Sequence, residues 1–237
     1  MKNVFAVTAL AALTLVGCGG GDGDSSSSGT NTPDVSQFSH NGIYANTQDL
    51  VLMLVDSNRE TNALIVGDFS QNAIIAAHDA SVKGDTMTLK GLTYVDTSMF
   101  QSDSTLSATA SFDESGVTLT GKVDNDFYSY SLAKAPDTKP LSEFTGTYTN
   151  PNDGSVWTVS ESGELTINGD CQISGQLQRN GAYFNLNYGL VSNCSDPGLN
   201  GPGSGVVLTA TYQGKDYMAG VFSGVDERVL WGSVPLQ

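Results

Sequence analysis

The sequence predicts an all-β protein with two tandem small antiparallel β-barrel or sandwich domains, which follow a signal peptide and a flexible tether. Three observations support this prediction. Short runs rich in Thr, Val, Tyr and Phe alternate with Gly, Asn, Asp and Ser turns. Several short segments recur at a nearly constant offset, and after the first residues no stretch sustains a helical periodicity between capping residues.

The chain begins with a segment that is typical of an export signal. Lys2 supplies a positive charge, and residues 4–16 form an apolar run that only threonines interrupt. This run is too short to cross a membrane as a helix, and it ends in 15-LVGC-18. We therefore expect residues 1–17 to be a signal peptide.

The segment 15-LVGC-18 resembles the lipobox of bacterial lipoproteins. The resemblance implies that the Cys18 thiol is diacylated and that the new amino terminus is acylated as well. Three acyl chains would anchor the protein permanently, whereas one chain holds only marginally. Gly19 and not Asp follows the anchor, which in enteric-type bacteria implies sorting to the outer membrane. The expected location is the outer membrane, facing the periplasm or the outside.

Residues 18–40 are predicted to be the lipidated cysteine and its tether. The stretch after Cys18 is rich in Gly and Ser and has no apolar side chain before Val35. Flexible linkers have this composition, and about 20 such residues reach roughly 25 Å. The membrane, through the lipid, is thus one expected partner.

The body of the chain, from about Gly42, alternates between strand-like and turn-like segments. The turns include 113-DESG-116 and Asn180-Gly181, and the Asn-Gly pair favours a type I′ hairpin. Several of the strand-like runs alternate polar with apolar residues, as half-buried strands do. These runs are 49–56, 86–95, 104–112, 116–123 and 126–132.

An internal repeat predicts the domain organisation. The pair 42-GIYAN-46 and 146-GTYTN-150 is offset by 104 residues. Two further pairs are offset by 102 residues: Gly67-Asp68 with Gly169-Asp170, and 106-LSAT-109 with 208-LTAT-211. Matches in the same order at a nearly constant offset indicate two homologous domains.

The boundary between the domains is predicted at a polar stretch that Pro136 and Pro140 bracket. We therefore assign a first β domain to residues 41–134, a linker to 135–143 and a second β domain to 144–237. One larger sandwich or barrel is the alternative.

The cysteines support a disulfide in the second domain. If Cys18 carries lipid, Cys171 and Cys194 remain as an even pair in an oxidising compartment. A bond between them closes a loop of 23 residues and contributes about 3 kcal/mol in the chain-entropy model. A metal site is less favoured, because no histidine lies nearby.

The charge of the chain excludes one class of partner. There are 25 acidic and 10 basic residues, which gives a net charge of −15. Phosphate binding depends on Lys and Arg, so no nucleic-acid partner is expected. Acidity of this kind keeps an exported protein soluble.

Catalytic motifs are scarce. His78 adjoins Asp79, but neighbouring strand residues point to opposite faces. The segment 131-SLAK-134 has the Ser-x-x-Lys spacing without the Lys-Thr-Gly partner, and 150-NPNDGS-155 lacks the full calcium-loop pattern. We therefore expect no enzymatic activity, no cofactor and no metal. A pair of carboxylates for glycoside hydrolysis is the enzymatic alternative.

The candidate binding surface lies in the second domain. The long loop 192–205 is rich in Gly and Pro, and long loops on β scaffolds often carry recognition. Tyrosines and other aromatic residues dominate binding hot spots. The candidate residues are Tyr183, Phe184, Tyr188, Asn193, Asp196 and Asn200.

The last strands carry a second resemblance. The segments 220-GVFSG-224 and 232-GSV-234 resemble the terminal strands of surface lipoproteins that end in an eight-stranded barrel, such as the bacterial transferrin-binding lipoproteins. The resemblance implies a barrel. It covers only the stretch 220–234, and the doubled glycine usual at 232 is missing, so no ligand residue is carried over.

These observations predict a lipid-anchored, non-enzymatic module that binds an envelope or extracellular protein or a small-molecule ligand. An immunity or inhibitor lipoprotein that neutralises a secreted toxin or hydrolase is the first alternative, since an acidic module can block a basic active site. A glycan-active hydrolase is the second.

Overall fold

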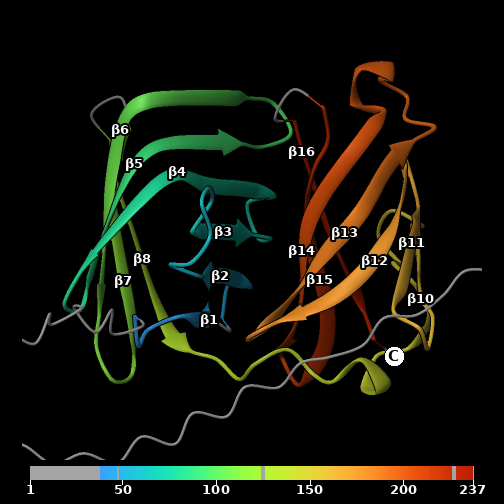
Figure 1. Cartoon of the computed structure of the whole chain (residues 1–237), viewed down its shortest axis with the longest axis horizontal. Helices are drawn as coiled ribbons and strands as arrows, with labels where there is room; N and C mark the ends of the chain where they lie inside the picture. Colours follow the sequence, from blue (N-terminus) through green and yellow to red (C-terminus); the bar gives the residue numbers. More distant parts are fainter. Residues whose placement is uncertain (1–37, 47, 124–125, 226–227, 237) are drawn as a thin grey trace, which may run out of the picture. The chain divides into compact units, whose positions relative to one another are not determined.

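The computed structural model describes residues 38–46, 48–123, 126–225 and 228–236. The predicted signal peptide, the cysteine predicted to carry lipid (Cys18) and most of the predicted tether lie outside the described residues. Within the described part, the strands form two eight-stranded antiparallel sheets (Figure 1). The predicted all-β class with two tandem barrel domains is therefore confirmed, and the alternative of one larger barrel or sandwich is wrong.

The first sheet is a closed barrel in which each strand pairs with its neighbours in sequence. Its first and last strands close it through the pairs Tyr44↔Lys134 and Ala45↔Ala133. The strands are β1 (Gly42–Asn46), β2 (Val51–Val55), β3 (Leu64–Asp68), β4 (Ala73–Lys83), β5 (Thr86–Val95), β6 (Phe100–Phe112), β7 (Gly116–Val123) and β8 (Asp126–Lys134).

The second sheet has the same sequential order but is not closed by a strand ladder. At the seam between its first and last strands, Asn150 Nδ2 donates a hydrogen bond of 3.0 Å to the Ser233 carbonyl. The strands are β9 (Gly146–Thr149), β10 (Val156–Val159), β11 (Glu164–Asn168), β12 (Gln172–Asn180), β13 (Tyr183–Ser192), β14 (Gly201–Tyr212), β15 (Lys215–Ser223) and β16 (Val229–Pro235).

The segments that repeat in the sequence occupy equivalent places in the two sheets. The first match covers β1 and β9, the second lies at the ends of β3 and β11, and the third lies in β6 and β14. Gly42 and Gly146, which begin the two sheets, have φ angles of 139° and 145°, a region that side chains disfavour. Glycine therefore recurs at this place in both sheets because the backbone conformation there disfavours other residues.

Each barrel has its own apolar interior. In the first barrel, Met53, Leu64, Val66, Met87 and Leu89 are almost fully buried. In the second, Phe144, Trp157, Leu165, Val207 and Met218 have the same role. Phe144 lies just before β9, and the other side chains lie on strands at the alternate positions that face the interior.

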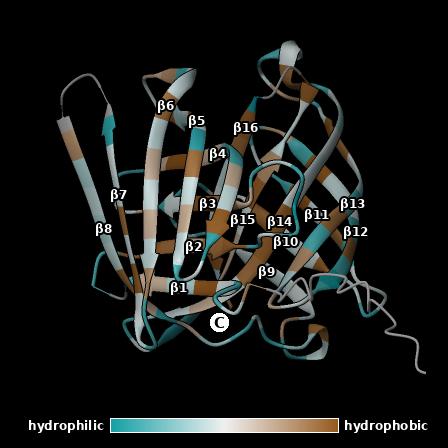
Figure 2. Cartoon of the chain, turned by 60° about the vertical axis from the view of Figure 1, so that its left-hand side comes forward, coloured by the Kyte–Doolittle hydropathy of each residue, from teal (hydrophilic) through white to brown (hydrophobic). Residues whose placement is uncertain are grey.

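A third apolar cluster joins the two barrels, because outward-facing side chains of β1–β4 pack against outward-facing side chains of β13–β15. Leu52, Leu54 and Ile65 contribute from the first barrel, and Val206 and Leu208 contribute from the second. Every residue of 51-VLMLV-55 is therefore buried, and the apolar colouring of β2–β4 in Figure 2 shows the same pattern. A strand that is buried on both faces has a continuous apolar sequence.

A polar group also links the two barrels. Tyr183 Oη donates to Asp56 Oδ2 at 2.9 Å and accepts from Arg59 Nη1 at 3.1 Å. Asn180 Nδ2 donates to the same hydroxyl at 2.7 Å. Since Tyr183 is 2 % exposed and Asp56 is 7 % exposed, these bonds satisfy groups that are costly to bury alone.

The predicted linker, residues 135–143, lies against the second barrel and ends in the short 3-10 helix η1 (Leu141–Glu143). The Thr138 N–H donates to the Ala182 carbonyl at 2.8 Å, and the Thr138 carbonyl accepts from Arg179 Nη1 at 2.6 Å. Thr138 is 2 % exposed, so this segment is a packed connection.

Two local predictions need correction. The predicted tether extends to residue 40, but Phe38 and His40 pack on Phe112, with ring centroids 5.2 and 5.1 Å away. The predicted hairpin at Asn180-Gly181 exists, but Gly181 alone of this pair has a positive φ. Asn180 is the last residue of β12, so the Asn-Gly pair does not form the central two residues of a type I′ turn.

No helix in the described ranges has both the length and the apolar character needed to cross a membrane.

Candidate functional site

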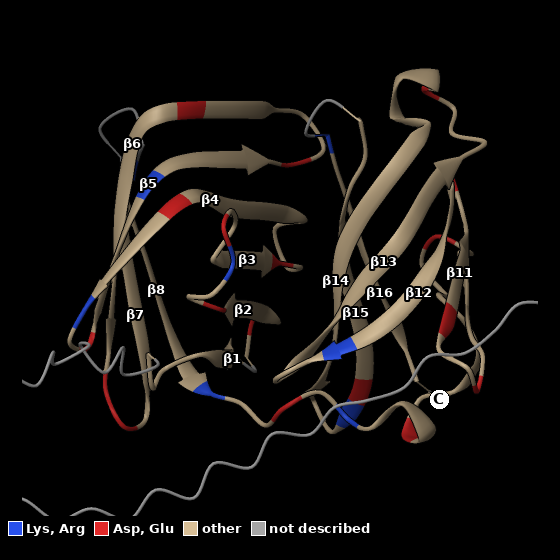
Figure 3. Cartoon of the chain, in the orientation of Figure 1, with Lys and Arg blue, Asp and Glu red and all other residues tan. Residues whose placement is uncertain are grey.

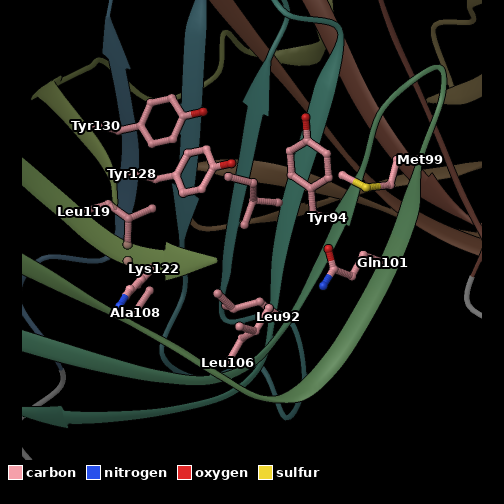
Figure 4. Close-up of a pocket in the computed structure, with 12 residues that line it drawn as sticks. Leu92, Tyr94, Met99, Gln101, Leu106, Ala108, Leu119, Lys122, Tyr128 and Tyr130 are labelled. Carbon is pink, nitrogen blue, oxygen red and sulfur yellow. The ribbon is translucent and has the colours of Figure 1, made fainter. Parts of the chain in front are cut away.

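An apolar cavity of about 90 Å³ opens at one end of the first barrel. Figure 4 shows Tyr94, Met99 and Gln101 on one side of it and Tyr128 and Tyr130 on the other. The rest of the wall is apolar apart from Gly121 and the exposed Lys122, and its apolar members are Ile75, Leu92, Leu106, Ala108 and Leu119. We call this cavity the first-barrel pocket.

The pocket exists because the barrel separates at this end. β6 begins at Phe100 but pairs with β7 only over 108–112, opposite 117–121. β8 begins at Asp126, but it pairs with β1 only at 133–134. The first half of β6 and the β7–β8 hairpin thus diverge, as Figure 2 shows.

A backbone irregularity aims the side chains of the pocket. The pairing of β5 with β6 shifts between Lys90 and Leu92, where Gly91 has a φ of 70°. A Cβ on Gly91 would lie 2.6 Å from His78 Nδ1, so only glycine fits there. Such shifts re-aim the side chains that follow. Leu92 and Tyr94 accordingly line the pocket.

One of the tyrosine hydroxyls is held by the β5–β6 turn. Tyr94 Oη donates to Asp96 Oδ2 at 2.9 Å, and Asp96 Oδ1 accepts from the Ser98 and Met99 N–H groups at 2.7 and 2.8 Å. The hydrogen bonds from Ser98, followed by the one from Tyr94, lower the pKa of Asp96 to about 2. Asp96 thereby fixes the turn that presents Met99.

A second hydroxyl is held deeper in the barrel. Tyr130 Oη donates to Asp68 Oδ2 at 3.3 Å, and Asp68 is 5 % exposed. Burial, followed by the Asp68 charge, raises the pKa of Tyr130 to about 12. Burial and the contact with Asp96 likewise raise the pKa of Tyr94 to about 12. Both phenols therefore stay neutral at physiological pH, and the pocket keeps its apolar character.

The rim of the pocket exposes large apolar side chains. Met99 is 46 % exposed and Tyr128 is 42 % exposed. Phe100 and Phe127, on the outer sides of the same strand ends, are 51 % and 83 % exposed. Lys122 lies 5.6 Å from the centre of the Phe127 ring. Figure 3 shows charged side chains on β4, β5 and β6 as well as in turns. At this rim Lys122 and Asp96 lie beside an otherwise apolar surface.

The chain matches no protein-family model, no curated protein and no solved structure. The function is therefore argued from the geometry.

Two of the residues predicted to form a binding surface are buried. Tyr183 belongs to the cluster between the barrels, and Phe184, 4 % exposed, packs edge-on against Phe144 inside the second barrel. Neighbouring strand residues do point to opposite faces, as expected, but here both faces are covered. The prediction that these two side chains belong to an exposed surface is wrong.

The other four candidates lie on the surface, and three of them shape the long loop. Asp196 Oδ1 accepts from the Gly198 N–H at the start of the short 3-10 helix η2 (Pro197–Leu199), and its carboxylate pairs with Arg228. Asn200 Oδ1 accepts from the Cys194 N–H at 3.1 Å. Asn193 Nδ2 donates to Gln172 Oε1 at 3.1 Å. These bonds give the residues a structural role.

Tyr188 is the remaining candidate and is 93 % exposed. It lies at an irregularity of β13, where the pairing with β14 shifts between Leu186 and Gly189 and Tyr188 has a φ of 52°. The structure does not bring it together with Tyr183 or Phe184, which are buried. The predicted set therefore does not form one surface.

The predicted disulfide is present. Cys171 and Cys194 are bonded with a Cα–Cα distance of 4.1 Å, and the bond ties the β11–β12 turn to the loop after β13.

The first-barrel pocket was not among the predicted sites, although one of its strands carries a usable signal. The segment 126-DFYSYSL-132 was predicted as a strand, and its adjacent Phe127 and Tyr128 must point to opposite faces. One aromatic ring of this pair therefore had to lie outside the barrel. The rest of the pocket depends on the shift between β5 and β6, which no motif marks.

Proposed function

We propose that this protein is a non-enzymatic binding module of the cell envelope, held by lipid on Cys18, and that it captures a partner protein at the open end of its first barrel. The observation that carries the proposal is the first-barrel pocket with its exposed apolar rim.

The size of the pocket favours a side chain of a protein as the occupant. Pockets for drug-sized molecules have volumes of roughly 300–1,000 Å³. A cavity of about 90 Å³ has room for only a short apolar group. The rest of the occupant must extend over Met99, Tyr128 and the neighbouring Phe127, which suits a partner that presents one Leu or Phe from a larger surface.

The chemistry of the rim also favours a protein partner. Exposed apolar patches on soluble folds commonly mark interaction sites, and hot spots cluster where an aromatic or apolar anchor enters a desolvated pocket. Burying one Leu or Phe side chain contributes about 1.5–3 kcal/mol. The Tyr94 and Tyr130 hydroxyls already have partners on Asp96 and Asp68, so an apolar occupant leaves neither hydroxyl unsatisfied.

Site-specific photo-crosslinking in the cells that make the protein tests the proposal. A photoreactive amino acid replaces Met99 or Tyr128 in the full-length chain, and the same replacement at Val82 is the control. Val82 is 45 % exposed and lies at the other end of β4, away from the pocket. We expect a discrete crosslinked partner from Met99 and Tyr128 and none from Val82.

A second variant tests whether the partner occupies the first-barrel pocket. Leu119→Phe fills the pocket from β7, and we expect the crosslink from Met99 to fall about tenfold or more, as for a lost hot spot. An unchanged crosslink in a folded Leu119→Phe protein, or equal labelling from Val82, would reject the proposal. A crosslinked toxin or hydrolase would identify the inhibitor form of the same activity.

The lipid anchor is tested separately. Mass spectrometry of the amino-terminal peptide of the native protein should show three acyl chains on Cys18 and no residues 1–17. An unmodified amino-terminal peptide would reject the anchor but not the binding activity.

A further inference from the structure

The second barrel contains a larger pocket of different chemistry. Its volume is about 820 Å³, within the range of pockets for whole small molecules. It lies between the β9–β10 and β11–β12 loops on one side and the facing ends of β15 and β16 on the other. We call it the second-barrel pocket.

The floor of this pocket is apolar and aromatic. Trp157 and Phe222 line it with ring centroids 6.1 Å apart, and Ile167 and Ile173 lie beside them. Trp157 Nε1 donates to Ser155 Oγ at 3.2 Å. Trp231, also in the lining, donates through Nε1 to Asn72 Oδ1 at 2.8 Å. Both indole N–H groups are thus occupied within the protein. Trp157 and Phe222 are only 3 % and 2 % exposed, so the half-buried Trp231 is the ring of this set that offers a ligand the most surface.

The backbone is adapted to this floor. Gly232 of β16 packs close to the indole of Trp157, and a Cβ at this position would lie 3.2 Å from Trp157 Cζ2. The absence of a side chain at 232 lets the large Trp157 ring occupy the interior where β9 and β16 meet without a ladder.

The rim of the pocket is acidic. Asp153 and Asp170 line it, and no Lys or Arg is among the described residues of the lining. Both side chains are exposed, and Asp153 Oδ1 accepts a hydrogen bond of 2.8 Å from the Ser155 N–H. The charges of this lining are therefore all negative.

We propose that the second-barrel pocket binds a small organic cation, an ammonium group that carries an apolar body. The face of an aromatic ring such as Trp231 attracts such cations, and the carboxylates of Asp153 and Asp170 at the rim add charge complementarity. The apolar floor binds the body of the ligand, which selects an organic cation over a hydrated metal ion. This site is separate from the first-barrel pocket and does not depend on the function proposed for it.

Tryptophan fluorescence provides a direct readout, because the chain has only two tryptophans and both Trp157 and Trp231 line this pocket. The full-length protein is titrated with choline and with 3,3-dimethylbutan-1-ol, which has the same shape but carbon in place of the charged nitrogen. We expect a saturable change in tryptophan fluorescence with choline. The dissociation constant of the neutral alcohol should be about tenfold or more higher.

Two double variants separate the pocket from the general charge of the protein. Asp153→Asn with Asp170→Asn should weaken choline binding about tenfold and leave the binding of the alcohol unchanged. Asp79→Asn with Glu161→Gln changes the net charge equally at exposed positions outside the pocket, and it should bind choline as the original chain does.

Three results would overturn the proposal. They are the lack of any saturable response to choline, equal affinity for choline and the alcohol, and equal losses in the two double variants. Circular dichroism of each variant confirms that these results come from folded protein. None of them bears on crosslinking at Met99 or Tyr128.

Discussion

The two barrels share one strand order but differ in how they close and in what their open ends offer. The first is closed by hydrogen bonds between β1 and β8, and its pocket is small and apolar. The second lacks that ladder but has a disulfide, and its pocket is large and lined by aromatic and acidic side chains. A repeated scaffold can thus keep its backbone plan while the chemistry at its ends diverges.

The largest expected effect comes from the cluster that joins the barrels. Leu54 is 2 % exposed, and Leu54→Asp places an unpaired charge in this cluster. We expect the free energy of unfolding to fall by about 4 kcal/mol, because a buried carboxylate has no partner there. The barrels should then unfold in two calorimetric transitions, whereas the original chain should show one.

Val82→Asp is the matched control, since Val82 is exposed on the same barrel. Its effect should stay within about 0.5 kcal/mol. If Leu54→Asp leaves a single transition at the original temperature, the cluster does not couple the two barrels.

A smaller effect is expected from the disulfide, and it should distinguish the barrels. Replacing Cys171 and Cys194 by Ala releases a loop of 23 residues and should lower the free energy of unfolding by about 3 kcal/mol. Hydrogen exchange should increase most in β11–β13, next to the bond, and least in β5–β7. Equal increases in both barrels would show that they unfold only as one unit.

The smallest effect concerns acid and the β5–β7 end of the first barrel. The pKa of Asp96 is lowered from 3.8 to about 2, so its stabilising contribution is complete above pH 3.8 and is lost as the pH falls toward 2. As the pH falls from 3.8 toward 2, the melting temperature of the Asp96→Asn variant should therefore fall less than that of the original chain. The side chain is exposed, so a shift of a few degrees or less is expected.

Hydrogen bonds from Lys139 and Thr211 likewise lower the pKa of Asp216, which lies in the second barrel. Asp216→Asn is the comparison for Asp96→Asn. A melting profile between pH 4 and 2 that neither variant alters would show that these carboxylates do not contribute to acid stability.

Much of the first barrel could be predicted from the sequence, because half-buried strands show their period directly. The predicted runs 86–95 and 116–123 coincide with β5 and β7. β6 begins at Phe100, four residues before the predicted run. The prediction missed these four residues because they do not alternate clearly between apolar and polar side chains. The closed order of β1–β8 depends on long-range pairing, which no local pattern specifies.

The binding residues were harder to predict, because burial on the outer face of a strand depends on the other barrel. Tyr183 has the chemistry of a surface hot spot, yet the first barrel covers it. The continuous apolar run 51-VLMLV-55 was the available sign that an outer face of the first barrel is covered. The second-barrel pocket combines loops that are far apart in the sequence, so composition and spacing do not reveal it.

The apolar cluster between the barrels has a consequence for biogenesis. During synthesis, all strands of the first barrel are made before β13–β15, the strands that cover its outer wall. Until then, the outer wall of the first barrel would expose the apolar side chains of Leu52, Leu54 and Ile65, and exposed apolar surface promotes aggregation. Export of the chain in an unfolded form would postpone this exposure until both halves are available together.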